Sequence, residues 1–159
     1  MGDSRLSPVT AAAERVAARR RWMSVLAQAP PEALEAACAD LERPPYRRLR
    51  GPEVGLVMVR ARAGATGMRF NLGEMTVTRC TVQLGDGTLG HAWIAGRCAA
   101  HAETAALLDA LLQDAARGPA LEAAVVGPLA EAQAARRRAA VERAAASRVE
   151  FFTMVRGED

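Results

Sequence analysis

The stretch that most constrains the fold runs from residue 52 to residue 84 and reads PEVGLVMVRARAGATGMRFNLGEMTVTRCTVQL. It opens with an uninterrupted apolar run, residues 54–59, which lies between Gly51-Pro52 and Arg60. An apolar run of this length without polar alternation is typical of a strand that is covered on both faces. We therefore expect residues 54–59 to lie in the centre of a sheet.

A second strand is predicted at residues 76–84, where the side chains alternate in character. Thr76, Thr78, Cys80, Val82 and Leu84 fall on one face, and the residues between them fall on the other. Because successive side chains of a strand point to opposite faces, this pattern indicates a half-buried strand. The intervening residues 63–73 contain three glycines and are predicted to form a loop.

Four arginines in this stretch are candidate ligand-binding residues. Arg60 and Arg62 leave the first strand on one face, Arg69 lies in the predicted loop, and Arg79 lies in the second strand. Guanidinium groups and glycine-rich backbone N–H groups together suit a polyphosphate or a phosphonate. The loop is not a P-loop, since no Gly-Lys-Ser/Thr follows. A purely structural glycine loop with surface arginines is the alternative.

Helices are predicted on both sides of this stretch. Ser7-Pro8 suits a helix start, and the helix extends to about residue 29. Pro30-Pro31 ends it and begins a second one, and residues 46–50 form a short edge strand between prolines and arginines. The segment HAETAALLDALLQDAAR is an amphipathic helix that covers the sheet.

Asp86-Gly87 is the strongest hairpin signal in the chain. A two-residue turn here pairs Cys80 with Trp93 and Val82 with His91, which puts His91 on the more apolar face. We interpret His91 as a structural histidine.

The last helix is predicted at residues 129–146, and Val141 is its only large apolar residue after Leu129. Such an alanine-rich helix gains little from burial and needs close packing against another surface. The apolar tail VEFFTMV is expected to complete the sheet or to enter a partner. This helix and the amino-terminal helix are the predicted partner-binding elements.

These elements predict a single α+β domain over residues 1–159. We expect an antiparallel sheet of four to five strands, helices at both ends of the chain and one covering helix.

The motifs also carry a resemblance. PEVGLVMVRARAG, TGMRFNLGEMTVTRC, DGTLGHAWIAGR, HAETAALLDALLQ and VEFFTMVRGED, preceded by RRRWMSVLA, resemble in this order PhnG, the G subunit of the bacterial carbon-phosphorus lyase core complex. The likeness spans residues 21–159.

The resemblance implies an accessory subunit of an enzyme complex. In that family, the complex displaces adenine from ATP with a phosphonate and forms α-D-ribose 1-methylphosphonate 5-triphosphate. The I subunit carries the nucleosidase activity and is the expected closest partner, with the H and J subunits in the same complex. The complex would use ATP with magnesium, and no cofactor is expected on this subunit. The alternative is a stand-alone phosphate-ligand-binding or enzymatic domain that uses the arginine and glycine-rich loop.

No catalytic residue and no metal ligand is assigned. His101 and Glu103 are weaker site candidates, because their His-x-Glu spacing after Cys98 resembles that of zinc deaminases. The Pro-Cys-x-x-Cys that such enzymes need is absent downstream, and members of the family commonly carry an acidic residue at the position of Cys98. Glu103 is explained by the helix dipole, and Glu53, Glu74 and Asp109 are interpreted as surface carboxylates.

Composition narrows the classes of function that the chain can have. All twenty-one basic residues are arginine, yet the net charge is only +3 and six residues are aromatic, which does not favour a nucleic-acid binder. The three cysteines lack the spacing of a disulfide framework or a zinc ribbon. With no membrane-length apolar run and no signal region, we expect a cytoplasmic protein. The alanine-rich last helix and the apolar tail predict that the chain can self-associate when it is expressed alone.

Overall fold

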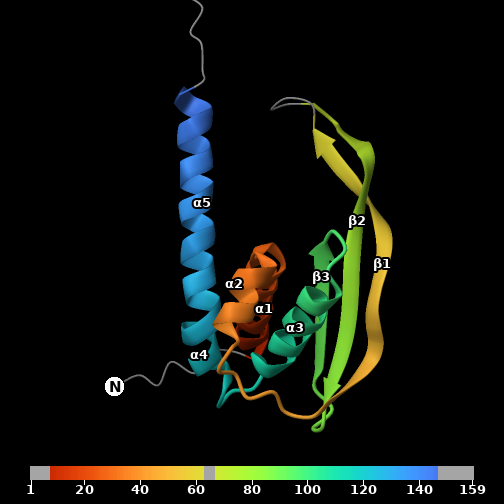
Figure 1. Ribbon diagram of the computed structural model, residues 1–159, viewed down its shortest axis with the longest axis vertical. Helices are drawn as coiled ribbons and strands as arrows, with labels where there is room; N and C mark the ends of the chain where they lie inside the picture. Colours follow the sequence, from red (N-terminus) through yellow and green to blue (C-terminus); the bar gives the residue numbers. More distant parts are fainter. Residues whose placement is uncertain (1–7, 63–66, 147–159) are drawn as a thin grey trace, which may run out of the picture.

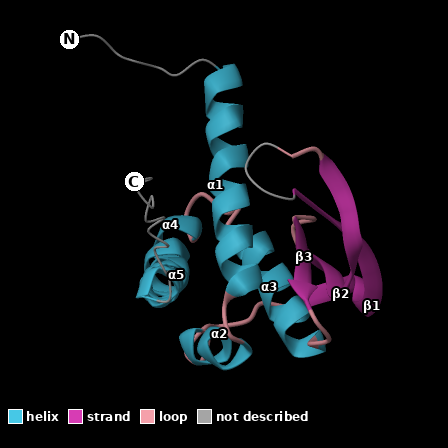
Figure 2. Ribbon diagram, turned by 90° about the horizontal axis from the view of Figure 1, so that it is seen from above, coloured by secondary structure: helices cyan, strands magenta, loops and turns pink. Residues whose placement is uncertain are grey.

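The computed structural model describes residues 8–62 and 67–146, and in these residues all helices lie on one side of a three-stranded antiparallel sheet (Figures 1 and 2). The α+β class and the helices near both ends of the chain are confirmed. The elements follow in the order α1 Pro8–Gln28, α2 Pro31–Ala37, β1 Tyr46–Arg62, β2 Arg69–Leu84, β3 Leu89–Ala95, α3 Ala99–Leu111, α4 Gly118–Leu121, the π-helix η1 Glu122–Val126 and α5 Gly127–Ala146.

The expected sheet of four to five strands is wrong for the described residues, which form three strands in the order β1-β2-β3. Residues 46–50 and 54–59, which we predicted as separate strands, belong to the single strand β1. The chain passes Gly51-Pro52 with shifts in register instead of turning back. The proline is tolerated because β1 is an edge strand. The apolar tail that we expected as a further strand lies outside the described residues.

The predicted central position of residues 54–59 is also wrong. β1 lies at the edge of the sheet and pairs only with β2. Val54, Leu56 and Met58 are 55%, 62% and 52% exposed, respectively. Strand β3 pairs with residues 77–83 of β2 and with none of the residues before them. The outer half of the β1–β2 hairpin therefore has no third strand and extends past α1, α2 and α3 (Figure 1).

The hairpin between β2 and β3 is confirmed, but its predicted register is wrong by one residue. Cys80 lies opposite Ala92 and Val82 opposite Gly90, whereas His91 lies opposite Thr81. The loop holds three residues rather than two, because Leu84 N–H donates to the carbonyl of Thr88 at 2.9 Å. Gly87 has a φ of 90°, as this wider loop requires. His91 consequently lies on the face of the sheet that the helices leave open.

Helix α3 lies at the centre of the core, and residues 105–111 are all buried. It packs on the face of the sheet formed by Cys80, Val82 and Ala92, which are each at most 4% exposed. The helix approaches β3 so closely that a Cβ on Gly90 would lie 1.9 Å from the carbonyl oxygen of Ala106. Helix α1 supplies the second layer with Trp22, Val25 and Leu26, and Ala29, just after its end, is also buried.

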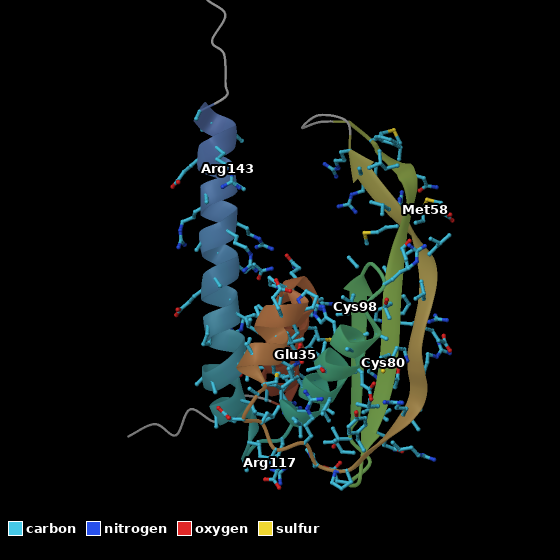
Figure 3. All side chains as sticks on the ribbon, in the orientation of Figure 1. Glu35, Met58, Cys80, Cys98, Arg117 and Arg143 are labelled. Atoms are coloured by element: carbon cyan, nitrogen blue, oxygen red, sulfur yellow. The ribbon has the colours of Figure 1, made fainter. Side chains whose placement is uncertain are left out.

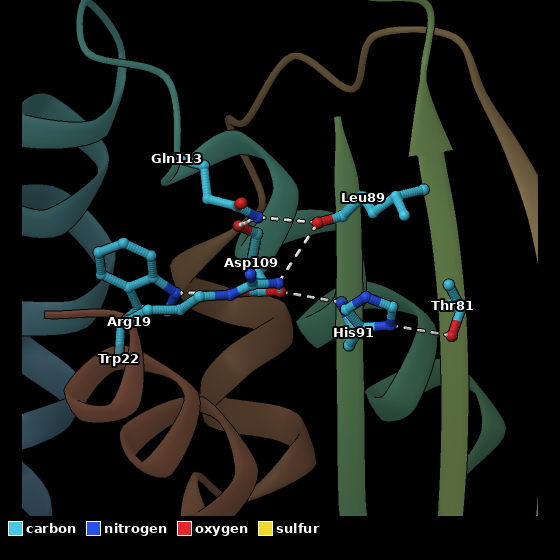
Figure 4. Close-up of polar contacts among 7 residues, drawn as sticks. All are labelled: Arg19, Trp22, Thr81, Leu89, His91, Asp109 and Gln113. Carbon is cyan, nitrogen blue, oxygen red and sulfur yellow. Dashed lines mark hydrogen bonds and ion pairs between the residues drawn. The ribbon is translucent and has the colours of Figure 1, made fainter. Parts of the chain in front are cut away.

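The carboxylate of Asp109 joins three elements (Figure 4). Arg19 of α1 donates to both of its oxygens, through Nε at 3.0 Å and Nη2 at 2.7 Å. Trp22 donates its indole N–H at 2.9 Å, and the backbone N–H of His91 in β3 donates at 2.9 Å. Asp109 is fully buried, so its interpretation as a surface carboxylate is wrong. A buried carboxylate needs such partners because an unpaired one is very unfavourable.

The outer part of α5 leaves the core. Leu129 is its one buried residue in the described chain, and Gln133 and Arg137 both donate to the side-chain oxygen of Gln28 at 2.6 and 2.8 Å. Val141 is 68% exposed. The predicted helix at residues 129–146 is confirmed, and its surface stays largely open. None of the described helices is both long and apolar enough to cross a membrane.

The close approach at Gly90 predicts a large effect of one methyl group. Gly90→Ala should lower the free energy of unfolding by about 3 kcal/mol, because α3 must move away from the sheet. Gly55→Ala is the matched control, since nothing lies within 4 Å of its added Cβ. Urea denaturation of both variants measures the difference, and equal stability of the two would contradict the packing.

Asp109→Asn should lower the free energy of unfolding by about 2 to 4 kcal/mol, because it leaves the partly buried guanidinium of Arg19 without its counter-charge. Arg20→Gln is the control, because Arg20 is an exposed neighbour on the same helix and should change stability by less than about 0.5 kcal/mol. Thermal and urea unfolding test this, and a stable Asp109→Asn protein would show that the carboxylate is dispensable.

Candidate functional site

Three of the four candidate arginines lie together at the tip of the β1–β2 hairpin. Arg62 lies directly opposite Arg69 in the ladder, and Arg60 lies opposite Asn71. Opposite residues of an antiparallel pair share a face, as do residues two apart in one strand. Arg60, Arg62 and Arg69 therefore share one face, and all three are exposed. We call these three residues the arginine cluster.

The cluster forms for a different reason from the one predicted. Arg69 is not in a loop but is the first residue of β2. The ladder slips by one residue between Val59 and Arg60. An irregularity of this kind leaves one extra residue in one strand and changes which of its side chains face the partner strand. This slip brings Arg69 onto the face of Arg60 and Arg62.

Arg79 is not part of the cluster. It lies ten residues from Arg69 along β2, which is about 33 Å of strand. Its guanidinium donates to Glu53 through Nε at 3.2 Å and lies 3.1 Å from the same carboxylate through Nη2. It also lies over the ring of Trp93, 5.6 Å from the centroid. Arg79 therefore has its partners, Glu53 and Trp93, on the open face of the sheet.

The arginine cluster has no counter-charge among the described residues. No hydrogen bond or ion pair of its three guanidinium groups is found among residues 8–62 and 67–146. Like charges directly opposite in a ladder are destabilising. An anion bound between Arg62 and Arg69 would convert this repulsion into charge-assisted hydrogen bonds. The geometry therefore suits a phosphate or a carboxylate from outside the described chain.

His101 has a structural position at the start of α3. Its ring is 5% exposed, and Nε2 lies 2.8 Å from the carbonyl oxygen of Leu26. A carbonyl only accepts hydrogen bonds, so Nε2 carries the proton and donates. His101 thereby ties α3 to the end of α1. The described residues contain no group of three His, Cys, Asp or Glu side chains placed to hold a metal ion.

Glu103 joins α3 to the base of β1. Tyr46 donates its hydroxyl to Oε1 at 2.5 Å, and Arg48 donates Nε to the same oxygen at 2.6 Å. Partial burial works to raise the pKa of Glu103, but the hydrogen bonds from Tyr46 and Arg48 outweigh it and the pKa lies below its usual value. The same hydrogen bond raises the pKa of Tyr46. These contacts, and not the helix dipole alone, explain Glu103.

The cysteines are placed apart. Cys38 and Cys80 are buried, and burial raises the pKa of both thiols. Cys98 is partly exposed and precedes α3. Figure 3 shows Cys80 and Cys98 beside the core and Met58 on the outer hairpin, well away from them. The arginine cluster thus has no thiol near it in the described chain.

Sequence reasoning missed the two polar clusters around Asp109 and Glu103. A signal for the first was present, because Asp109 stands inside the apolar segment ALLDALL of α3. An acidic residue among apolar neighbours in a covering helix indicates a buried, paired carboxylate. The partners Tyr46 and Arg48 of Glu103 are more than fifty residues away in the chain, and no local pattern reveals them.

Comparison with known proteins shows the family to which this chain belongs. A family model described as "Phosphonate metabolism protein PhnG" matches residues 17–157, which is most of the chain. The chain is also 48% identical over 145 residues to the alpha-D-ribose 1-methylphosphonate 5-triphosphate synthase subunit PhnG of Rhizobium meliloti (strain 1021), covering 91% of this chain and 92% of that protein. The chain belongs to the PhnG family, as the sequence motifs indicated.

The Glu103 cluster gives a pH prediction. Because the folded pKa is lowered, the stability that Glu103 contributes is present above its unfolded pKa of about 4.3 and is lost as pH falls through the folded value. Glu103→Gln should lower the free energy of unfolding by about 1.5 kcal/mol at pH 7, and by progressively less toward pH 3. Urea denaturation across this range tests the prediction, with the exposed Glu35→Gln as control. A difference that does not depend on pH would contradict it.

Proposed function

We propose that this chain is an accessory subunit of an α-D-ribose 1-methylphosphonate 5-triphosphate synthase in phosphonate degradation. The relative in Rhizobium meliloti is named as a subunit of this synthase, and its 48% identity to this chain supports the same role here. In the proposed reaction a phosphonate displaces adenine from ATP, and the triphosphate stays on the ribose. ATP enters the assembled complex with magnesium, and no cofactor resides on this subunit.

The observation that carries the proposal is the arginine cluster. Arg60, Arg62 and Arg69 are exposed on one face of the hairpin tip, and two of them lie directly opposite each other. A triphosphate offers several anionic oxygens to such forks, and arginine binds them bidentately. The cluster binds phosphate groups of the substrate or product within the assembled complex.

The carboxylates of the chain support an accessory role. Displacing a nucleobase has oxocarbenium character, for which paired carboxylates are expected. Asp109, Glu103 and Glu53 are instead engaged with arginines of this chain. We therefore assign the nucleosidase chemistry to the I subunit, with the H and J subunits as further partners.

The cluster predicts a defect in ligand binding without a defect in assembly. Arg69→Ala should weaken ATP binding by the assembled complex by about 1.5 to 3 kcal/mol, the range for a hydrogen bond to a charged group. Arg69→Lys should restore only part of the lost ATP affinity, because a point charge does not reproduce the bidentate fork. Titration of the assembled complexes with ATP and methylphosphonate measures the effect.

Arg20→Ala on α1 is the control and should leave ATP affinity unchanged once assembly is complete. Unchanged affinity in Arg60→Ala, Arg62→Ala and Arg69→Ala would return the cluster to a structural role. Tight ATP binding or turnover by the isolated chain would favour a stand-alone phosphate-binding or enzymatic domain instead.

A further inference from the structure

The outer part of the β1–β2 hairpin is the largest feature that the chain's own fold does not explain. We call residues 53–62 and 69–76 the hairpin arm. From Leu56 outward they form a two-stranded ribbon, since β3 pairs with β2 only from Val77 onward and Val77 lies opposite Gly55. Figure 1 shows this ribbon extending beyond α1, α2 and α3. Two-stranded ribbons are marginally stable in water unless another element covers them.

Both faces of the hairpin arm carry exposed apolar side chains. Val54, Leu56 and Met58 lie on one face at alternate positions and are 55%, 62% and 52% exposed. Phe70 and Met75 are paired with Ala61 and Val57 and lie on the opposite face, with exposures of 45% and 42%. Contiguous exposed apolar surface of this kind marks an interaction site.

The amino-acid sequence supplies the second argument. Residues 54–59 have the uninterrupted apolar pattern of a strand buried on both faces, yet among the described residues none fully covers either face. The strand is also regular along this stretch, as strand addition to its free edge requires, because its register with β2 is unbroken from Glu53 to Val59. At the base, by contrast, Pro52 and two register shifts disrupt the edge, which is how natural sheets discourage pairing.

We propose that the hairpin arm docks into an apolar groove of a different subunit, which covers both of its faces and borders it with carboxylates. This proposal rests on the proposed function, since the partner is another subunit of the synthase. Docking would carry the arginine cluster at the tip of the arm into the site where the partner holds the nucleotide. The exposed arm and the exposed arginines then have one explanation.

Charge argues against a second copy of this chain as the occupant. Strands β1 and β2 carry seven arginines and two glutamates, whereas the whole chain has a net charge of only +3. Six of the seven arginines lie at the ends of the hairpin: Arg47, Arg48 and Arg50 at the base, and Arg60, Arg62 and Arg69 at the tip. Two copies paired in parallel bring tip against tip, and two paired antiparallel bring tip against base. Both arrangements oppose like charges, whereas an acidic border complements them.

The decisive variant is Leu56→Glu, which places a charge in the middle of the hairpin arm. Leu49→Glu is the matched control, because Leu49 is in the same strand and is 46% exposed but lies at the base. Leu56→Thr is the milder variant, which keeps a good strand former at the position. Each chain is co-expressed with the I subunit, and binding is measured by titration calorimetry with purified subunits.

We expect Leu56→Glu to weaken binding to the I subunit at least about tenfold, Leu56→Thr to weaken it less, and Leu49→Glu to leave it near wild type. The thermal midpoint of the isolated chains should stay unchanged, since Leu56 is exposed in them. Hydrogen exchange at residues 53–59 should slow when the wild-type complex forms. Equal binding by Leu56→Glu and Leu49→Glu would overturn the proposal, as would a dimer of the isolated chain that Leu56→Glu dissociates.

The triple variant Arg60→Gln/Arg62→Gln/Arg69→Gln separates this proposal from the proposed function. If the triple variant assembles and binds ATP normally while Leu56→Glu fails to assemble, the arm is confirmed and the ligand role of the cluster is wrong. If the triple variant loses ATP affinity and Leu56→Glu assembles normally, the ligand role stands and the arm is not the docking element.

Discussion

The buried carboxylate of Asp109 is the interaction on which the rest of the fold depends. It receives hydrogen bonds from α1 and from the open edge of β3, while α3 itself carries it into the core. Gln113 of the same helix donates to the carbonyl of Leu89 at 2.8 Å and satisfies a further group of that edge. Asp109, Arg19 and Gln113 therefore tie α1 and α3 to β3 and satisfy two backbone groups of its outer edge, the N–H of His91 and the carbonyl of Leu89.

The rest of the described chain supports the two edges of the sheet to different extents. The β3 edge is closed by side chains of α1 and α3, and the base of β1 is held to α3 by Glu103. The outer half of β1 receives no such support from the described residues. Helix α5 likewise extends past the helical layer, and Figure 3 shows Arg143 near its far end. The parts that the core does not stabilise are the parts available to other subunits.

The candidate site follows from the same arrangement. Arg79 lies over the core half of the sheet and is paired with Glu53, so it contributes to the fold. Arg60, Arg62 and Arg69 lie on the outer half, where the ladder places like charges together and the described chain offers no counter-charge. Under the proposed function, the anion that this cluster binds is a phosphate group of the substrate or product. The sequence indicated these three arginines together with Arg79, and only the structure showed that Arg79 lies apart from them and pairs with Glu53.

The sequence by itself determined the helices, the β2–β3 hairpin, the α+β class and the family, because helix periodicity, turn residues and ordered motifs are local properties of the chain. Only the tertiary structure decided that residues 46–62 form one edge strand, that the turn holds three residues, and that Asp109 is buried. These outcomes depend on contacts between residues far apart in the chain, such as Arg19 with Asp109. The apolar pattern of residues 54–59 is typical of a strand covered on both faces, but no local pattern shows whether such a cover exists or which chain supplies it.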